Sequence, residues 1–274
     1  MPSPQNSGSQ SSSLLIVVPT LNSYSLLPRL LGSLQQQTWP HWQLLFIDGA
    51  SGAQHRHWLE QCCMAESRCR WLRQDPVDSG IFGAMNQGFA EAALDDWLMF
   101  WGSDDWAAGP VVLAEVVAAL ARAASQDNTP DLLVCRGRYA EGATGALARY
   151  TVFQADGMLS TGAYRRALFL GSTPPHQATL IGPAARRRLA CYSPGFRLSA
   201  DLDYFLRLSC HPGLRVQCLD LELVHMADSG LSGQQTQRRL KEVRHAYSRA
   251  FGWRWGFPFV ARYLRRLASL LYWH

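Results

Sequence analysis

Two adjacent aspartates, Asp104 and Asp105, follow a short hydrophobic run that ends at Trp101. Oxygen ligands suit hard divalent cations, so paired carboxylates at the end of a strand can hold such an ion against a diphosphate. The ion would neutralise the charge that develops on the diphosphate as it leaves. The same two residues also fit a polar turn in which Asp105 caps the next helix. The pair therefore indicates either a metal site or a capped turn.

A third aspartate, Asp48, ends an earlier hydrophobic run. A carboxylate there can accept hydrogen bonds from a ribose or a base, and it can equally stabilise its own loop through an Asx turn. Residues 78–88 combine a polar loop with a helix start, where Asp78 and Asn86 could contact a nucleotide or a sugar. The alternative for this segment is an ordinary helix capped by Asp78 or Ser79.

Asp201 lies at the opening of an amphipathic segment, where an exposed carboxylate could take the proton from an attacking hydroxyl. Its alternative role is to offset the helix dipole in the first turn, and Asp203 is expected on a different face of the helix. His176 precedes one strand-like run and His225 follows another, and either imidazole could bind phosphate or metal. A lone histidine beside a strand is more often structural, so neither is included among the predicted metal ligands.

Strands and helices that alternate over the first 130 residues must position these side chains. Continuous β-branched or aromatic runs predict buried strands, and leucines or alanines at helical spacing predict helices. The first strand is expected to stop at Pro19, with Thr20 or Asn22 capping the helix that follows. The expected strands are 14–18, 42–47, 70–73 and 97–101, and the expected helices are 26–36, 54–66, 83–93 and 110–124.

This alternation predicts an α/β fold with a mostly parallel sheet and helices on both faces. Ligands of such sheets bind beyond the carboxyl ends of the strands, which is where Asp48, Asp104 and Asp105 fall. The pattern loosens in the second half, but no long polar linker divides the chain. The elements expected there are strands at 131–138 and 150–153, a proline-containing loop at 171–177, and short helices at 186–190 and 201–209.

Composition limits the class of protein. The chain has 274 residues, of which 47% are hydrophobic and 17% charged, so it can bury a substantial core. Its seven cysteines form no C-x-x-C pair, which favours reduced thiols in a cytoplasmic protein. Residues 1–13 lack the features of a signal peptide and are expected to be a flexible leader, and no apolar run is long enough for a spanning helix.

Taken in order, these segments resemble the family 2 glycosyltransferases, especially bacterial enzymes that build exopolysaccharide or lipopolysaccharide. On the donor side, residues 16–22 resemble the family's opening strand and turn, and residues 47–51 resemble its nucleotide-binding aspartate loop. Residues 78–88 resemble a segment of one bacterial subgroup, and residues 102–105 resemble the metal-binding DXD equivalent. On the acceptor side, residues 176–178 resemble the acceptor-side strand, residues 200–203 the helix of the catalytic base, and residues 229–232 the closing loop. The subgroup commonly has an acidic residue where Gly83 stands and a lysine where Gln87 stands, so the donor sugar stays open.

The resemblance implies a GT-A-like, Rossmann-related fold, an inverting reaction, a UDP- or GDP-sugar donor and a Mn²⁺ or Mg²⁺ ion. By position, Asp201 would be the catalytic base, Asp105 and Asp104 would hold the metal, and His176 and Gln177 would lie on the acceptor side. The residues that would contact the nucleotide sugar are Pro19, Thr20, Asn22, Asp48, Asp78, Gly80, Asn86 and Asp104.

The predicted activity is that of a metal-dependent, hexosyltransferase-like enzyme. It would move a sugar to a hydroxyl of a saccharide or lipid-linked saccharide in bacterial surface polysaccharide biosynthesis. The alternative is a catalytically inactive nucleotide-sugar-binding scaffold at the membrane surface. A nucleotidyltransferase would show a glycine- and basic-rich phosphate loop where residues 19–22 stand.

The chain is expected to divide into three parts: a leader at 1–13, a GT-A domain at 14–233 and a helical tail at 234–274. Within the GT-A domain, residues 14–109 are the expected nucleotide-sugar half and residues 110–233 the expected acceptor half.

The tail is basic, rich in tryptophan and amphipathic. Such a segment fits the surface of an anionic membrane, which would place the enzyme on the inner face of the cytoplasmic membrane beside a lipid-linked acceptor. A helix packed on the catalytic domain or on a second subunit would show the same pattern. Nucleic acid is not an expected partner, because no recognisable binding module accompanies the basic residues.

Overall fold

The computed structural model describes residues 13–141, 146–151, 153, 157–227 and 236–271, without the side chains of 266 and 268–271. The expected leader, apart from residue 13, and the expected closing loop at 229–232 lie outside the described residues. One sheet has the strand order β3-β2-β1-β4-β9-β6-β10-β5, with β7 on β6 and β8 on β10. The strands are β1 Leu14–Thr20, β2 Trp42–Asp48, β3 Cys69–Arg73, β4 Trp97–Phe100, β5 Trp106–Ala107, β6 Leu132–Ala140, β7 Leu147–Tyr150, β8 Gly157–Leu159, β9 Thr179–Ile181 and β10 Val216–Ala227.

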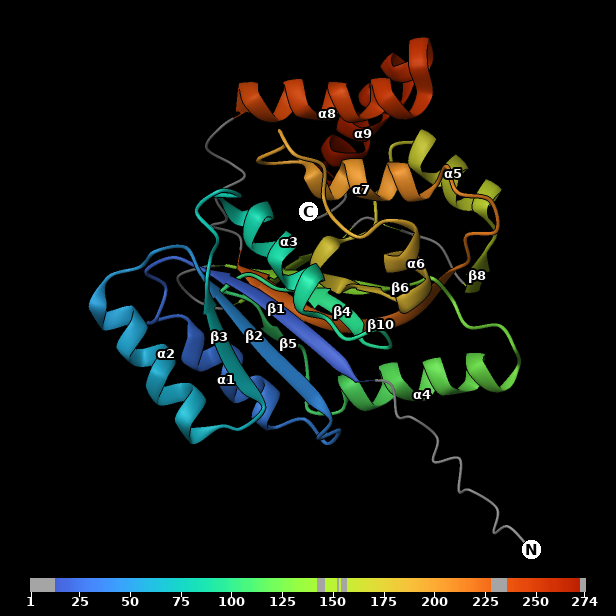
Figure 1. Cartoon of the computed structure of the whole chain (residues 1–274). Helices are drawn as coiled ribbons and strands as arrows, with labels where there is room; N and C mark the ends of the chain where they lie inside the picture. The colour runs from blue at the N-terminus through green and yellow to red at the C-terminus, as the bar shows by residue number, and fades with distance from the viewer. Residues whose placement is uncertain (1–12, 142–145, 152, 154–156, 228–235, 272–274) are drawn as a thin grey trace, which may run out of the picture.

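Helices cover both faces of this sheet (Figure 1). On one face α1, α2 and α4 enclose a hydrophobic core, and on the other α3, α5, α6 and α7 enclose a second, which α8 extends. The helices are α1 Leu27–Gln35, α2 Ala53–Ala65, α3 Ile81–Glu91, α4 Val112–Ser125, α5 Thr161–Phe169, α6 Pro183–Arg188, α7 Ala200–Leu208, α8 Thr236–Phe251 and α9 Gly256–Leu271, with short 3-10 helices η1 His176–Ala178 and η3 Gly252–Trp255.

The buried run of β1 shows why the sequence folds in this way. Leu14, Ile16 and Val18 contribute to the core beneath α1, α2 and α4. Leu15 and Val17 point to the opposite core, which α3 covers. Because successive side chains of a strand alternate between faces, a strand covered on both sides must be hydrophobic at every position. The expected α/β fold with helices on both faces is confirmed.

The sheet is parallel throughout its first half and mixed in its second. Strands β3, β2, β1 and β4 pair in parallel, whereas β9 is antiparallel to both β4 and β6, and β10 is parallel to β6 but antiparallel to β5 and β8. A mixed sheet therefore replaces the mostly parallel one that was expected. A parallel partner needs a long crossover connection, and the regular strand–helix alternation that supplies it in the first half is lost after β4.

Three local expectations are wrong. β1 continues through Pro19 to Thr20, because its pairing with β4 already ends at Val17 and no ladder bond on that side needs the missing N–H. Neither Thr20 nor Asn22 caps α1, which has a proline in its first turn and no side-chain cap. β7 ends at Tyr150, where the sequence predicted a strand to begin.

Candidate active site

The loops that follow β1, β2 and β4 are joined by hydrogen bonds at one edge of the sheet. Asn22 has a left-handed backbone with φ of 51°, and its side-chain oxygen accepts from the Gly52 amide at 2.8 Å. The Asn22 amide donates to the Ser51 hydroxyl, also at 2.8 Å. Ser103, just before the aspartate pair, donates to the Pro19 carbonyl at 3.1 Å. Predicted donor-binding positions from separate segments therefore lie together on one rigid edge.

Asp48 is the last residue of β2 and is fully buried. Both of its carboxylate oxygens lie 3.2 Å from the Ser51 amide, three residues further on, which donates to them and stabilises the loop after β2. His55 lies 3.7 Å away, and burial lowers the pKa of this histidine although the nearby Asp48 charge opposes the change. The structure thus shows the loop-stabilising role of Asp48, and its contact with a nucleoside stays a prediction.

Asp104 and Asp105 converge over Gly102. A Cβ atom at Gly102 would lie 2.7 Å from Asp104 Oδ1 and 3.3 Å from Asp105 Oδ2, so a larger residue there would force the Asp104 carboxylate to move. The Gly102 amide donates to Asp105 Oδ2 at 2.6 Å. Asp105 does not cap a helix, since α4 begins only at Val112. The turn that was the alternative to a metal site is present, and it brings the two carboxylates together.

Burial raises the pKa of Asp104, and burial with the neighbouring Asp104 charge raises the pKa of Asp105 well above its usual range, although the Gly102 amide opposes the rise. A divalent cation would offset this cost, because it supplies the positive charge that two desolvated carboxylates lack. Within the described residues, no group of three or more histidine, cysteine, aspartate and glutamate side chains is arranged to hold a metal. The fit to a cation rests on these two carboxylates.

Asp201 is the second residue of α7 and is partly exposed. Among the described residues, no hydrogen bond or ion pair engages its carboxylate. His176 and Tyr192 lie close enough for its charge to act on both. His176 Nε2 and the Tyr192 hydroxyl are 2.5 Å apart, and the imidazole stacks on Phe100 of β4. Burial lowers the pKa of His176 and raises that of Tyr192, so both are neutral neighbours of the aspartate.

The second acceptor-side residue, Gln177, is joined to β4 through its backbone. Its carbonyl accepts a hydrogen bond from the Trp101 indole at 3.0 Å. Since Trp101 directly follows β4, η1 is tied to the segment that carries the aspartate pair. The acceptor-side roles of His176 and Gln177 stay predictions.

A cavity of about 190 Å³ lies between the segment before α3 and the loop before α7. Arg197 lines it from the α7 side, and a Cβ atom at Gly80 on the opposite wall would be 3.5 Å from its guanidinium nitrogen. An arginine at such a site suits phosphate or carboxylate groups. The residues that line the cavity are Val77, Asp78, Ser79, Gly80, Ile81, Phe82, Gly83, Asn86, Ser193, Pro194, Gly195, Phe196 and Arg197.

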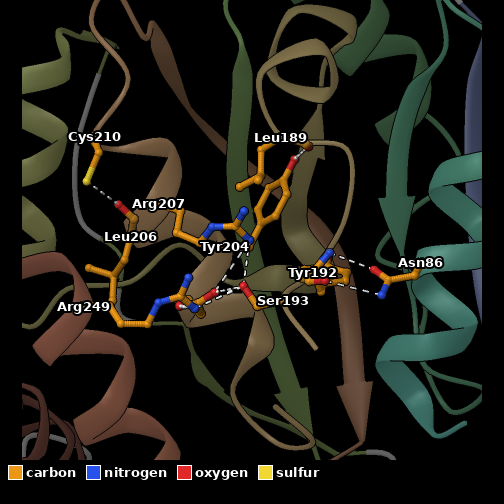
Figure 2. Close-up of polar contacts among 10 residues, drawn as sticks. Asn86, Leu189, Tyr192, Ser193, Tyr204, Leu206, Arg207, Cys210 and Arg249 are labelled. Carbon is orange, nitrogen blue, oxygen red and sulfur yellow. Dashed lines mark hydrogen bonds and ion pairs between the residues drawn. The ribbon is translucent and has the colours of Figure 1, made fainter. Parts of the chain in front are cut away.

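Asn86 holds the two walls of this cavity together (Figure 2). Its side-chain oxygen accepts from the Tyr192 amide at 2.7 Å, and its nitrogen donates to Asp78 at 3.0 Å. Neither Asp78 nor Ser79 caps α3, whose N-cap is Gly80 with φ of 92°. A Cβ atom at Gly83 would lie 1.9 Å from the Asp78 carbonyl oxygen. The absence of the subgroup's acidic residue at this position therefore lets the loop fold back over the helix.

His225 lies inside β10, where the sequence predicted it just beyond a strand. It pairs across the sheet with Trp106, the residue after Asp105. Its Nε2 atom is 2.6 Å from Glu222 Oε1, so the imidazole is engaged within the protein. The Glu222 contact gives the imidazole a partner within the protein beside the aspartate turn.

The sequence did not single out Tyr192, Ser193 or Arg197, which contribute to the wall of the site next to α7. A detectable signal was present in Ser193, Pro194 and Gly195, because a proline–glycine turn directly before a helix that bears a candidate base marks a loop able to line a site.

Comparisons with known proteins identify the family of this chain. A model of the glycosyl transferase family 2 matches residues 15–154. The PGL/p-HBAD biosynthesis glycosyltransferase of Mycobacterium bovis (strain BCG / Pasteur 1173P2) is 28% identical over 200 residues, which are 73% of this chain and 70% of the relative.

Solved structures share the fold at low sequence identity. Residues 1–349 of S. aureus TarS superpose with a TM-score of 0.67 at 14% identity, over 93% of this chain and 72% of that chain. The same TarS fragment has been solved with UDP-GlcNAc. The mannosyltransferase PcManGT from Pyrobaculum calidifontis, in complex with GDP-Man and Mn²⁺, superposes with a TM-score of 0.63 at 14% identity, over 95% of this chain and 72% of that chain. With a GT-A fold and a family match over just over half of its length, this chain belongs to glycosyl transferase family 2.

Proposed function

We propose that the chain transfers a sugar from a nucleotide-sugar donor to a hydroxyl of a saccharide or lipid-linked saccharide, with inversion at the anomeric carbon. The observation that carries the proposal is the Asp201 carboxylate, which opens α7 with no partner among the described residues and has neutral His176 and Tyr192 beside it. A carboxylate left free at a site edge is suited to accept a proton. The family membership supplies the reaction class.

In the proposed reaction, Asp201 removes the proton of the acceptor hydroxyl as its oxygen attacks the anomeric carbon from the face opposite the diphosphate. The bond to the acceptor forms as the bond to the diphosphate breaks, which inverts the configuration. Asp104 and Asp105 would hold the divalent cation, Mn²⁺ or Mg²⁺, which when bound neutralises the leaving diphosphate. The joined loops at Pro19, Asn22 and Asp48 would then position the nucleoside.

The donor and the ion are supported by relatives that share the fold. TarS binds UDP-GlcNAc, and PcManGT was solved with GDP-Man and Mn²⁺, so a UDP- or GDP-sugar with a divalent cation is the donor pair proposed here. The mycobacterial relatives act in the biosynthesis of PGL and p-HBAD, which supports a glycoconjugate acceptor. The inactive scaffold remains the alternative: it would bind the donor and transfer nothing.

The experiment that tests this proposal replaces Asp201 with Asn. Loss of a general base is expected to lower turnover by about 10²–10⁴-fold, while donor-induced thermal stabilisation stays unchanged. Asp220→Asn is a matched control, because this carboxylate is 70% exposed and lies outside the site. Near-normal turnover of Asp201→Asn would refute the base assignment. Donor binding by wild type with no transfer to any saccharide or lipid-linked acceptor would favour the scaffold.

The basic residues and the exposed apolar side chains of the tail support a membrane contact. Residues 236–271 carry eight arginines and one lysine against one glutamate. Five large apolar side chains of this region, spaced mostly three or four residues apart, are 54–87% exposed. They are Trp253, Phe257, Val260, Leu264 and Leu267. No described helix combines the length and apolar character needed to cross a bilayer. We infer that this stripe lies in the interface of an anionic membrane, since apolar insertion and basic charge act together there.

Vesicle sedimentation tests the membrane contact. Wild type is expected to bind phosphatidylglycerol-containing vesicles and not pure phosphatidylcholine vesicles. Phe257→Ser with Leu264→Ser should weaken that binding by at least about tenfold, since two large side chains leave the bilayer. Leu94→Ser is the matched control, because Leu94 is 83% exposed and lies far from the tail in sequence. Equal binding by the paired variant, or none by wild type, would contradict the proposal.

A further inference from the structure

Helix α8 packs along α7, the helix that carries the proposed base (Figure 1). Val243, Ala246 and Tyr247 of α8 are at most 1% exposed and belong to the same core as the buried residues of α7. This half of the tail is therefore part of the catalytic fold, which matches the packed-helix alternative of the sequence analysis. Two buried carboxylates add specific bonds to the apolar contact.

Glu242 of α8 binds the backbone just before α7. Its carboxylate accepts from the amides of Arg197 at 3.0 Å, Leu198 at 2.8 Å and Ser199 at 3.0 Å. Arg238, one turn earlier on α8, donates to the same carboxylate at 3.1 Å. Ser199 is the N-cap of α7, yet its own side chain makes no capping bond. A glutamate that lies 43 positions further along the chain thus binds three consecutive amides of the segment that leads into α7 and ends at its N-cap.

Asp203, two residues after the proposed base, is anchored by Ser193 and by Arg249 of α8, both of which Figure 2 labels. It is fully buried, and its oxygens accept from Arg249 of α8 at 2.8 Å and from the Ser193 hydroxyl at 2.6 Å. Arg207 and Arg249 both donate to the Ser193 oxygen as well, at 2.8 and 3.2 Å. This network joins α7, α8 and the cavity loop.

We propose that α8 positions the catalytic base: Glu242 and the Asp203–Arg249 pair hold the first turn of α7 on either side of Asp201. The inference rests on the proposed function, because it takes Asp201 as the base. Glu242 and Asp203 are positioning residues that touch no substrate. They fix the start of α7 in the one place where the sequence gives that helix no cap of its own.

The physical reason is that a base must keep its oxygen within hydrogen-bond reach of the acceptor hydroxyl, whereas a loose segment before α7 would let the first turn of the helix shift. A displacement of about 1 Å at a catalytic group can lower the rate by about a hundredfold. Three amide bonds to one buried carboxylate remove that freedom. The same bonds order residues 197–199, so the Arg197 wall of the cavity is held by α8 too.

The test replaces Glu242 with Gln, which keeps the shape but turns an amide NH₂ group toward backbone donors. Turnover is expected to fall by about 10- to 100-fold, while donor KM changes less, because only the cavity wall that carries Arg197 depends on Glu242. Hydrogen exchange at residues 197–204 should accelerate while the remaining core stays protected. Lys241→Ala, on the exposed face of α8 one residue earlier, is the matched control and should behave as wild type.

A second variant, Arg249→Ala, tests the same proposal if the Glu242→Gln protein does not fold. Arg249 is 41% exposed on its side chain, so Arg249→Ala removes one anchor of Asp203 without opening the core. It should lower turnover by about tenfold, and Arg249→Lys should restore part of the loss because it keeps the charge. Unchanged turnover per folded molecule in both Glu242→Gln and Arg249→Ala would overturn the proposal, even with a lower Tm.

The base assignment and the positioning role fail in different ways. If Asp201→Asn keeps near-normal turnover, the base assignment is wrong whatever Glu242 does. If Asp201→Asn abolishes turnover and Glu242→Gln leaves turnover and exchange at residues 197–204 unchanged, only the positioning role is wrong. In the double variant, Glu242→Gln should add little to Asp201→Asn, because a base that is absent cannot be misplaced.

Discussion

The aspartates after β4 and Asp203 of α7 have opposite surroundings. Asp104 and Asp105 are neighbours whose pKa values are raised by burial, and among the described residues no ion pair offsets either charge. Asp203 is just as buried, yet Arg249 and Ser193 bind both of its oxygens. Asp201 lies two residues before Asp203 on another face of the same helix. It is partly exposed, and no such partner binds it among the described residues.

The difference separates two uses of a carboxylate. A buried charge that the protein itself compensates serves the structure, because removing its partners would leave it stranded. A charge that the protein leaves uncompensated costs stability and is retained where a ligand supplies the missing partner. This criterion is the basis on which we propose a chemical role for Asp104, Asp105 and Asp201 and a positioning role for Asp203.

The strongest way to break the comparison is Asp105→Asn. If this carboxylate waits for a cation, its loss should lower kcat/KM by about 10²–10³-fold, because a metal contributes several kcal/mol to stabilising the leaving group. The donor should also lose its Mn²⁺-dependent thermal stabilisation. Titrating activity against Mn²⁺ measures both effects, and Asp220→Asn controls for the loss of one charge. A variant with normal activity and an unchanged Mn²⁺ response would show that Asp105 is structural.

Asp203→Asn tests the opposite side of the comparison. The neutral amide keeps the shape but weakens the bond to Arg249, so the free energy of unfolding should fall by about 1–3 kcal/mol, which roughly corresponds to a Tm lower by several degrees. The fully buried position of Asp203 is the reason for the size of the effect. Denaturant melts of this variant and of Asp201→Asn provide the contrast, since Asp201→Asn should lose little stability. Equal losses of unfolding free energy in the two variants would contradict the view that Asp203 stabilises the fold and Asp201 does not.

Gly102→Ala tests whether the Asp104 and Asp105 carboxylates must lie close together, and its expected effect is smaller. The new Cβ would meet Asp104 Oδ1 at 2.7 Å and push the two carboxylates apart, so activity should fall by about tenfold and the Mn²⁺ requirement should rise. Gly32→Ala is the matched control, because no atom lies within 4 Å of its added Cβ and alanine favours the α1 helix. Full activity of Gly102→Ala at low Mn²⁺ would show that the pair need not converge.

The sequence predicted the first half of the fold closely because each strand there is a continuous apolar run. β2 begins at Trp42 as expected and extends one residue beyond the predicted end, and β4 ends within one residue of the prediction. The second half was predicted less well. Short antiparallel strands such as β9 pair with strands that are distant in the sequence. The three residues of β9 are also too few to show the alternation of apolar and polar side chains that identifies a strand.

The same limit applies to the site. The predicted aspartates follow strands or open a helix, so local patterns could find them, and the expectation that Asp203 occupies another helical face is consistent with its burial beside α8. Glu242 and Arg249 looked like ordinary charges of a basic tail, because their partners lie about 40 to 60 residues earlier in the chain. Hydrogen bonds over such separations leave no signal in spacing or composition.

The smallest effect predicted here is the contribution of Asp105 to the pH dependence of stability. Its folded-state pKa is raised by burial and by the Asp104 charge, whereas its unfolded pKa is about 3.9. The stability that the neutral carboxyl contributes is therefore complete below about pH 4 and is lost as pH rises through the raised pKa. Asn does not titrate, so Asp105→Asn should gain stability relative to wild type as pH increases.

Melting both proteins in EDTA between pH 4 and pH 8 measures this difference. The Tm of Asp105→Asn minus that of wild type should become more positive toward pH 8, by roughly 2–4 °C for each kcal/mol of linked stability. Excess Mn²⁺ should reduce the gap, because the cation stabilises the charged pair only in wild type. A gap that does not change with pH would mean that the Asp105 charge is already compensated in the metal-free protein, and the contrast with Asp203 would then disappear.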